Sequence, residues 1–261
     1  MTINSALYRQ PELLDPAAHR RLKVGTLADF SITRGMHGAF ITATEMPQAA
    51  LEFPIVFIHS GELDAAGKPT VSPIVLLGLS QGENLYVEGT RWEARYIPAF
   101  IRRYPFLTAT LRNAGATGVM IDRAWSGFSE ADGEALFDAD DKPAPALKRA
   151  MEFLEMFETE AQRTRSFCAR VAELGLLKEM KADATLPGGA TLSIDGFLVV
   201  DEDKLQKLDP ELVLEAHRNG MLMLLHMHLA SLVNMRAMVE RKAKRAASAA
   251  GTAAGAPKPA P

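Results

Sequence analysis

Cysteine is nearly absent from this sequence of 261 residues, which contains only Cys168. No disulfide can form within the chain, so the fold does not depend on an oxidising compartment. Cys168 lies in a segment with helical periodicity. We expect it to be a small buried side chain rather than a reactive thiol.

Long apolar runs are also lacking. Residues 1–20 contain no apolar stretch, so we expect no signal peptide. The most apolar segment, 221–239, is interrupted by His226, His228, Asn234 and Arg236. A membrane span needs about 20 nearly uncharged residues. We therefore expect a buried helix there, no membrane span, and a cytoplasmic protein.

Neither sign of charge is in large excess. Lys and Arg total 29 against 32 for Asp and Glu, a formal net charge of −3. Nothing in this balance suggests the strongly basic face that a nucleic-acid-binding protein needs, so we expect no nucleic-acid partner. Apolar residues make up 48% of the chain, which is enough to form a buried core.

Motifs for catalysis or cofactor binding are scarce. There is no G-x-G-x-x-G or Walker pattern, so the glycine-flanked His37 has no phosphate-binding context. Residues 78–82 fit the string G-x-S-x-G, but a nucleophile elbow requires a helix after its serine. Residues 85–87 look like a strand instead. We therefore expect Ser80 to lie in a solvated hairpin turn between strands 74–77 and 85–87.

Metal ligands do not cluster in the sequence. On a helix, His226 and His228 would point about 200° apart, so they cannot share one ion without further ligands. The methionines around them are typical of core filler. His59, at the end of an apolar strand, has no partner assigned by spacing. The sequence therefore predicts no catalytic residue, no metal site and no cofactor.

The hydrophobic pattern predicts an α+β fold, with a β-rich N-terminal half packed against C-terminal helices. Strands are expected at 53–58, 74–77, 85–87, 106–111 and 118–121, and a short helix at 98–104. One helix or a broken pair is expected at 145–177. A final helix should begin at Asp209-Pro210 and end near Arg245. Between them, strands 191–194 and 197–200 should flank a turn at Asp195-Gly196.

The domain organisation follows from this pattern. We expect a single domain over residues 1–245, with a division near residue 140 as the alternative. Residues 246–261 are mostly Ala, Gly and Pro and cannot bury enough apolar surface to offset their ordering entropy. They are predicted to form a disordered tail.

Residues 92–106 combine aromatic side chains and arginines at high density. Such groups can bind carboxylates or peptide segments through bidentate hydrogen bonds and cation–π contacts. The alternative is a structural corner in which the arginines pair with Glu45, Glu52 or Asp122. If the segment is a site, the ligand-binding candidates are Trp92, Tyr96, Arg102, Arg103, Tyr104 and Glu52.

Several runs give the chain a family resemblance over roughly residues 5–240. They are Glu52-Phe53-Pro54-Ile55-Val56-Phe57, Gly82-Glu83-Asn84-Leu85-Tyr86-Val87, Tyr96-Ile97-Pro98-Ala99-Phe100-Ile101-Arg102-Arg103-Tyr104-Pro105-Phe106, Phe197-Leu198-Val199-Val200-Asp201-Glu202 and His228-Leu229-Ala230-Ser231-Leu232. In these runs the sequence resembles the SapC family of bacterial proteins. That family takes its name from a protein encoded beside surface-layer genes. The resemblance implies no established reaction and no catalytic residues.

Two functions remain open at this point. The first is a non-enzymatic binding or accessory protein that recognises a peptide, a carboxylated ligand or a protein partner. The second is an enzyme acting on an amino-acid or peptide substrate, with carboxylates such as Glu45, Glu52 or Asp122 as acid or base groups. A deep pocket that unites a carboxylate or His59 with Arg103 would favour the enzyme. The sequence indicates no oligomeric state.

Overall fold

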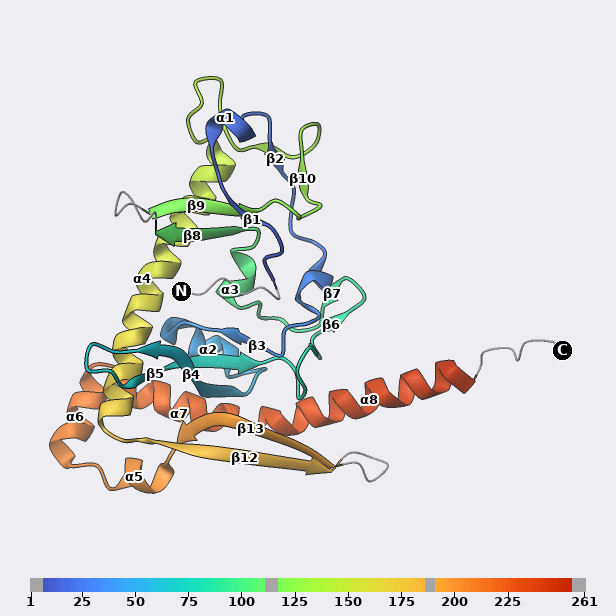
Figure 1. Ribbon diagram of the computed structural model, residues 1–261. Coiled ribbons are helices and arrows are strands. Elements are labelled where there is room, and N and C mark those ends of the chain that lie inside the picture. The colour runs from blue at the N-terminus through green and yellow to red at the C-terminus, as the bar shows by residue number, and fades with distance from the viewer. Residues whose placement is uncertain (1–6, 111–116, 186–190, 255–261) are drawn as a thin grey trace.

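The computed structural model describes residues 7–110, 117–185 and 191–254 (Figure 1). Strands dominate the N-terminal half and helices the C-terminal half, so the α+β prediction is confirmed. The long helix α4 (Pro145–Glu173) runs along one side of the molecule, from a three-stranded sheet to a five-stranded sheet. This helix therefore connects the layers built by the two halves of the chain.

The five-stranded sheet is antiparallel, in the order β12–β13–β4–β5–β3. Its strands are β3 (Gly38–Phe40), β4 (Ile55–Leu63), β5 (Pro69–Leu76), β12 (Leu177–Thr185) and β13 (Thr191–Val200). The apolar start of β4 is fully buried, as expected for a central strand. Beyond Ile58, strand β4 becomes exposed, and it forms a projecting hairpin with β5.

Smaller antiparallel sheets complete the β-structure. One has the order β1–β9–β8 and another the order β10–β2–β11, while β6 pairs with β7. The strands are β1 (Pro11–Leu13), β2 (Lys23–Val24), β6 (Val87–Glu88), β7 (Arg91–Trp92), β8 (Phe106–Thr110), β9 (Thr117–Asp122), β10 (Phe128–Ser129) and β11 (Glu134–Ala135). Strands β8 and β9 match the prediction for 106–111 and 118–121.

Two strand pairings differ from the prediction. Residues 74–77 do not form a hairpin with 85–87, because β5 pairs with β4 and β3 instead. Residues 191–200 form one continuous strand, β13, with no turn at Asp195-Gly196. The positive φ of Gly196 (80°) accompanies a shift in the register between β12 and β13. A glycine that relieves a bulge has the same sequence signature as a turn.

Helices supply the other layers. The shorter ones before α4 are α1 (Pro16–His19), the 3-10 turns η1 (Phe30–Thr33) and η2 (Ala43–Glu45), α2 (Met46–Ala49) and α3 (Ala99–Arg102). Helix α4 begins with Pro145 in its first turn, and its buried stripe includes Leu147, Leu154, Phe157, Ala161 and Cys168. The spacing of this stripe is what predicted the helix.

The final helix is broken twice. The structure has α6 (Pro210–Arg218), α7 (Met221–Ser231) and α8 (Asn234–Ala254) where one helix from Pro210 to Arg245 was expected, and the short helix α5 (Glu202–Gln206) precedes them. Gly220, with φ of 81°, sets the turn between α6 and α7. Helix α8 continues past Arg245 to Ala254. The rest of the predicted tail, 255–261, lies outside the described residues.

The main core joins both halves of the chain. One buried cluster extends from Leu7 and Tyr8 through Phe53 to Leu147 on α4 and Met238 on α8. No break in this cluster coincides with the alternative division near residue 140. The single domain with a tail stays a prediction, since a shared core does not by itself define the boundary of a domain.

Basic side chains of α8 fasten it to the loop before β6 and to the segment after β7. Arg245 donates to the carbonyl oxygens of Asn84 (2.7 Å) and Val87, and Arg241 donates to that of Glu93 (3.3 Å). The Arg241 guanidinium also lies 4.7 Å from the centre of the Tyr86 ring. These contacts make Arg241 and Arg245 part of the packing of α8 against the rest of the fold.

Candidate functional site

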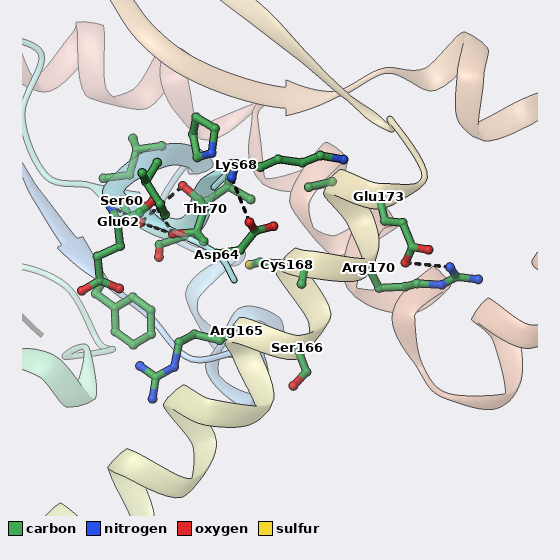
Figure 2. Close-up of a pocket in the computed structure, with 18 of the residues that line it drawn as sticks. Ser60, Glu62, Asp64, Lys68, Thr70, Arg165, Ser166, Cys168, Arg170 and Glu173 are labelled. Carbon is green, nitrogen blue, oxygen red and sulfur yellow. Dashed lines mark hydrogen bonds and ion pairs between the residues drawn. The ribbon is translucent and has the colours of Figure 1, made fainter. Parts of the chain in front are cut away.

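A cleft lies between the β4–β5 hairpin and the C-terminal half of α4 (Figure 2). Its volume is about 1420 Å³. Typical small-molecule pockets enclose roughly 300–1,000 Å³, so this cleft has room for a larger ligand. The hairpin forms one wall, α4 forms the other, and Phe40 and Phe100 line the cleft as well.

The alternation of side chains along the strands determines which hairpin residues face the cleft. Residues two apart on a strand point to the same face. His59 is exposed and does not line the cleft, whereas its neighbours in the sequence do. The strand residues that line the cleft on this face are Ile58, Ser60, Glu62, Thr70, Ser72 and Ile74. The hydroxyls of Ser60 and Thr70 are joined by a hydrogen bond.

The helix wall is one face of α4. Side chains three and four residues apart on a helix are neighbours, and the lining residues follow that spacing. They include Gln162, Arg165, Ser166, Ala169 and Glu173. The small side chain of Ala169 leaves the middle of this wall open. The helix therefore offers a polar, low-relief surface opposite the hairpin.

The charges of the cleft are not all neutralised. Arg170 is paired with Glu173 (2.9 Å) and Glu215 (3.0 Å), and these hydrogen bonds raise its pKa. Arg165 donates through Nε to the side-chain oxygen of Gln162 (3.0 Å). Within the described ranges, Arg165 has no carboxylate partner. The guanidinium of Arg165 is therefore able to bind an anionic group of a ligand.

The apolar part of the lining includes the side chains of Phe40, Ile58, Leu63, Val71, Ile74 and Phe100. Phe40 is held by an edge-on contact with Phe157 of α4 at 5.9 Å. Cys168 also lines the cleft, but its thiol is almost fully buried, and burial raises its pKa to about 12. This agrees with the expected role of Cys168 as a small packing residue.

The predicted Arg/aromatic segment, residues 92–106, contributes only Phe100 to the lining of this cleft. Arg103 is 6% exposed, and its guanidinium lies 4.5 Å from the Phe100 ring, 4.7 Å from the Phe157 ring and 6.0 Å from the Tyr8 ring. Burial raises the pKa of Tyr8 to about 12, and the neighbouring Arg103 opposes this effect. Arg103 is thus surrounded by rings of the core.

Tyr104 and Asp122 form a buried polar cluster next to Arg103. The Tyr104 hydroxyl donates to Asp122 Oδ2 (2.7 Å), and burial together with this bond raises the Tyr104 pKa. Asp122 also accepts hydrogen bonds from the backbone N–H groups of Gln10 (2.8 Å) and Arg9 (3.2 Å). Its carboxylate therefore ties the N-terminal segment to β9.

Hydrogen bonds within the fold also engage the side chains of Glu52, Trp92 and Tyr96. The Glu52 carboxylate accepts from the backbone N–H groups of Arg95 (2.9 Å) and Tyr96 (2.8 Å). Trp92 Nε1 donates to the Tyr96 carbonyl (2.8 Å), and the Tyr96 hydroxyl donates to Glu45 (2.6 Å). The carboxylates that were expected to neutralise arginines are bound mainly by backbone N–H groups and tyrosine hydroxyls.

Arg102 is the exception, since it is exposed. Its Nε donates to the Ile97 carbonyl (2.9 Å), and its guanidinium lies 5.3 Å from the Phe153 ring and 5.9 Å from the Tyr96 ring. Five of the six candidates lie along the segment 92–106, and Glu52 is joined to that segment by its hydrogen bonds to the Arg95 and Tyr96 N–H groups. None of the six lines the cleft, although Phe100 of the same segment does. A ligand-binding role for the six residues stays a prediction.

The arrangement that would have favoured an enzyme is not observed. Neither Arg103, His59 nor the carboxylates of Glu45, Glu52 and Asp122 line the cleft. Ser80 is partly exposed, and its hydroxyl accepts a hydrogen bond from Lys242 (2.8 Å). Lys242 also donates to both oxygens of the Glu83 carboxylate (2.9 and 3.0 Å). The Ser80 hydroxyl and the Glu83 carboxylate are thus both bound to one lysine within the fold.

His226 and His228 do point in different directions, as the helical spacing predicts. His228 is buried, and its Nε2 accepts a hydrogen bond from the Val200 N–H (3.0 Å). His226 is exposed. Over the ranges that the structure describes, no three His, Cys, Asp or Glu side chains are grouped to hold a metal ion.

His228 is expected to make the stability of the protein depend on pH. Burial lowers its pKa from 6.5 to about 4, against a smaller opposing effect of the Ile55 backbone. Between these values the unfolded chain binds the proton and the folded chain does not, so stability falls as pH drops from about 6.5 towards 4. We expect the step from pH 7.5 to pH 5.0 to cost about 2 kcal/mol through this group.

Urea unfolding of the wild type and of His228→Gln at both pH values checks this expectation. Glutamine can still accept the Val200 hydrogen bond but does not titrate. The difference in unfolding free energy between the two pH values should therefore be smaller for the variant by the amount above. An equal pH dependence of the two proteins would contradict the assignment.

One helical stretch, Met221–Ser248, is long and apolar enough to cross a membrane by length and composition alone. A turn at Leu232 and Val233 interrupts it between α7 and α8. Core helices of globular proteins pass the same test, so this stretch is weak evidence for a membrane span.

The fold and the cleft together define a class of protein: an antiparallel α+β protein with a groove between a projecting hairpin and a long helix. The SapC family model matches residues 14–238, so the chain belongs to the SapC family. No curated protein and no solved structure matches the chain.

The sequence reasoning did not predict the cleft. The residues that line the cleft come from two separate segments. Hydroxyl side chains alternate along β5, and small and polar side chains recur every three to four residues on α4. Each pattern alone looks like an ordinary solvated face. Only the packing of the hairpin against α4 shows that the two faces meet.

Proposed function

We propose that the protein is a non-enzymatic binding protein, and that the cleft between the β4–β5 hairpin and α4 recognises an extended peptide segment with a carboxylate. The observation that carries this proposal is the guanidinium of Arg165 on the wall of a large cleft whose lining includes aromatic and aliphatic side chains. The carboxylates considered as acid or base groups, Glu45, Glu52 and Asp122, lie outside the cleft and accept hydrogen bonds within the fold.

The dimensions of the cleft suit an extended peptide. The helix wall runs from Gln162 to Glu173, which at 1.5 Å per residue is a length of about 17 Å. About five residues of extended chain cover that distance. The hydroxyls of Ser60, Ser72 and Ser166 can exchange hydrogen bonds with peptide groups, and the rings of Phe40 and Phe100 can receive an apolar side chain.

The charge pattern favours a carboxylate in the peptide. Arg165 presents N–H groups in the fork geometry that matches a carboxylate, whereas the acidic lining residues Glu62 and Asp64 lie on the hairpin wall and Glu173 is paired with Arg170. A hydrogen bond to a charged group typically contributes about 1.5–3 kcal/mol. Loss of this contact should therefore weaken binding by about tenfold or more.

The test uses immobilised six-residue peptides, each made with a free C-terminal carboxylate and as the C-terminal amide. We expect a subset with apolar residues to bind the full chain, and we expect both amidation and Arg165→Gln to weaken that binding by about tenfold. Arg163→Gln is the matched control. Arg163 lies on α4 outside the cleft, paired with Glu160, so binding should not change.

A steric variant makes the test independent of charge. Ala169→Trp should fill the cleft and abolish binding, whereas Met156→Trp, at an exposed position of α4 outside the cleft, should not. Circular dichroism confirms that each variant is folded. Peptides that bind wild type and Ala169→Trp equally well, or a library with no binder, would overturn the proposal.

A further inference from the structure

A second hollow, independent of the cleft, lies at the corner between α6 and α7. It has a volume of about 410 Å³ and is lined by His217, Gly220, Leu222, Met223, His226 and Met227. Two imidazoles and two thioethers therefore border one small space. The sequence predicted that the methionines here fill the core, and Met221 does so, but Met223 is 52% exposed.

The local geometry explains why these side chains meet. Met223, His226 and Met227 are three and four residues apart, so they share one face of α7. His217 is in the last turn of α6, and the tight turn at Gly220 folds that end of α6 next to the start of α7. The flexible methionine side chains can place their sulfur atoms over the hollow.

The orientation of His226 suits a metal ligand. Its Nδ1 lies 2.7 Å from the Leu222 carbonyl oxygen. A carbonyl oxygen only accepts hydrogen bonds, so Nδ1 carries the proton and the Nε2 lone pair is left for another partner. A ligating histidine is usually held in this way, with its second ring nitrogen donating to a carbonyl or carboxylate.

We propose that this hollow binds a soft monovalent cation, with copper(I) as its physiological form. The ligands are the Nε2 atom of His226 and the sulfur atoms of Met223 and Met227, with His217 as a further imidazole. Thioether and imidazole ligands favour copper(I) over hard divalent ions, which need oxygen ligands. In the part of the chain that the structure describes, the hollow is bordered by no carboxylate.

The experiment titrates the full chain with copper(I) under anaerobic reducing conditions, in competition with the chromophoric chelator bicinchoninate. We expect one copper(I) to bind per chain. The double variant Met223→Leu and Met227→Leu conserves volume and apolar character but removes both sulfur atoms. It should bind about tenfold more weakly or worse, and His226→Gln should weaken binding similarly.

Two controls separate this site from other copper(I) ligands. The double variant Met151→Leu and Met156→Leu removes two exposed methionines of α4 and should bind as wild type does. Cys168→Ala removes the only thiol and should also leave the affinity unchanged. The proposal is overturned if copper(I) fails to bind, if the α4 variant loses as much affinity as the α7 variant, or if Cys168→Ala abolishes binding.

Discussion

Replacement of Asp122 by alanine is expected to lower the free energy of unfolding by about 4 kcal/mol. The carboxylate is buried and accepts hydrogen bonds from the Gln10 and Arg9 backbone and from the Tyr104 hydroxyl. Alanine would leave the Tyr104 hydroxyl without its acceptor in the interior and the Arg9 and Gln10 N–H groups without theirs in a part-buried position. Each buried, unsatisfied donor costs about 1–3 kcal/mol.

Urea unfolding measures this effect, and two further variants calibrate it. Tyr104→Phe removes one donor but leaves the carboxylate with its backbone partners, so it should cost about 1 kcal/mol. Asp140→Ala removes a carboxylate on the surface and should change stability by less than about 0.5 kcal/mol. A loss below about 1 kcal/mol for Asp122→Ala would contradict the role assigned to this residue.

Replacement of Arg103 by alanine is expected to cost about 3 kcal/mol, whereas Arg102→Ala should cost less than about 1 kcal/mol. The two neighbours differ in environment. Arg103 is packed among the rings of Tyr8, Phe100 and Phe157, so its removal leaves a cavity and ends several cation–π contacts. Arg102 is exposed and contacts only the edge of the core.

Chemical denaturation of both variants tests this difference, and Arg103→Met separates volume from charge. Methionine fills much of the space, so it should restore part of the lost stability if packing dominates. Equal stability losses for the two alanine variants would show that burial does not distinguish them. Loss of peptide binding in a folded Arg102→Ala variant would instead make the Arg/aromatic segment the recognition site.

The sequence predicted the parts of the fold that depend on local periodicity. The stripe of α4 and the strands β8 and β9 were predicted because one buried face repeats at a regular spacing. The breaks at Gly220 and Val233 were not, because the apolar pattern continues through them. The pairing of β5 with β3 and β4 was missed because residues 77–87 look like a strand and a tight turn.

The candidate site shows a similar limit. Density of arginine and aromatic residues correctly indicated an unusual segment, but density does not distinguish a surface site from a core corner. Arg102 and Arg103 are adjacent in sequence and have opposite exposure, which depends on where α4 places Phe157. The cleft forms where the β4–β5 hairpin packs against α4, and the hollow beside Met223 and His226 forms where α6 meets α7. The sequence of one segment alone does not show that it packs against the other.

The attachment of α8 bears on where this protein can be shortened. The family match ends at residue 238, whereas the contacts of Arg241, Lys242 and Arg245 begin just beyond that point. A chain cut at the family boundary would leave the carbonyls of Asn84 and Glu93 without these donors and Glu83 without its cation. Residues 241–245 therefore contribute contacts to the fold, and we expect a chain truncated at residue 238 to be less stable than the full chain.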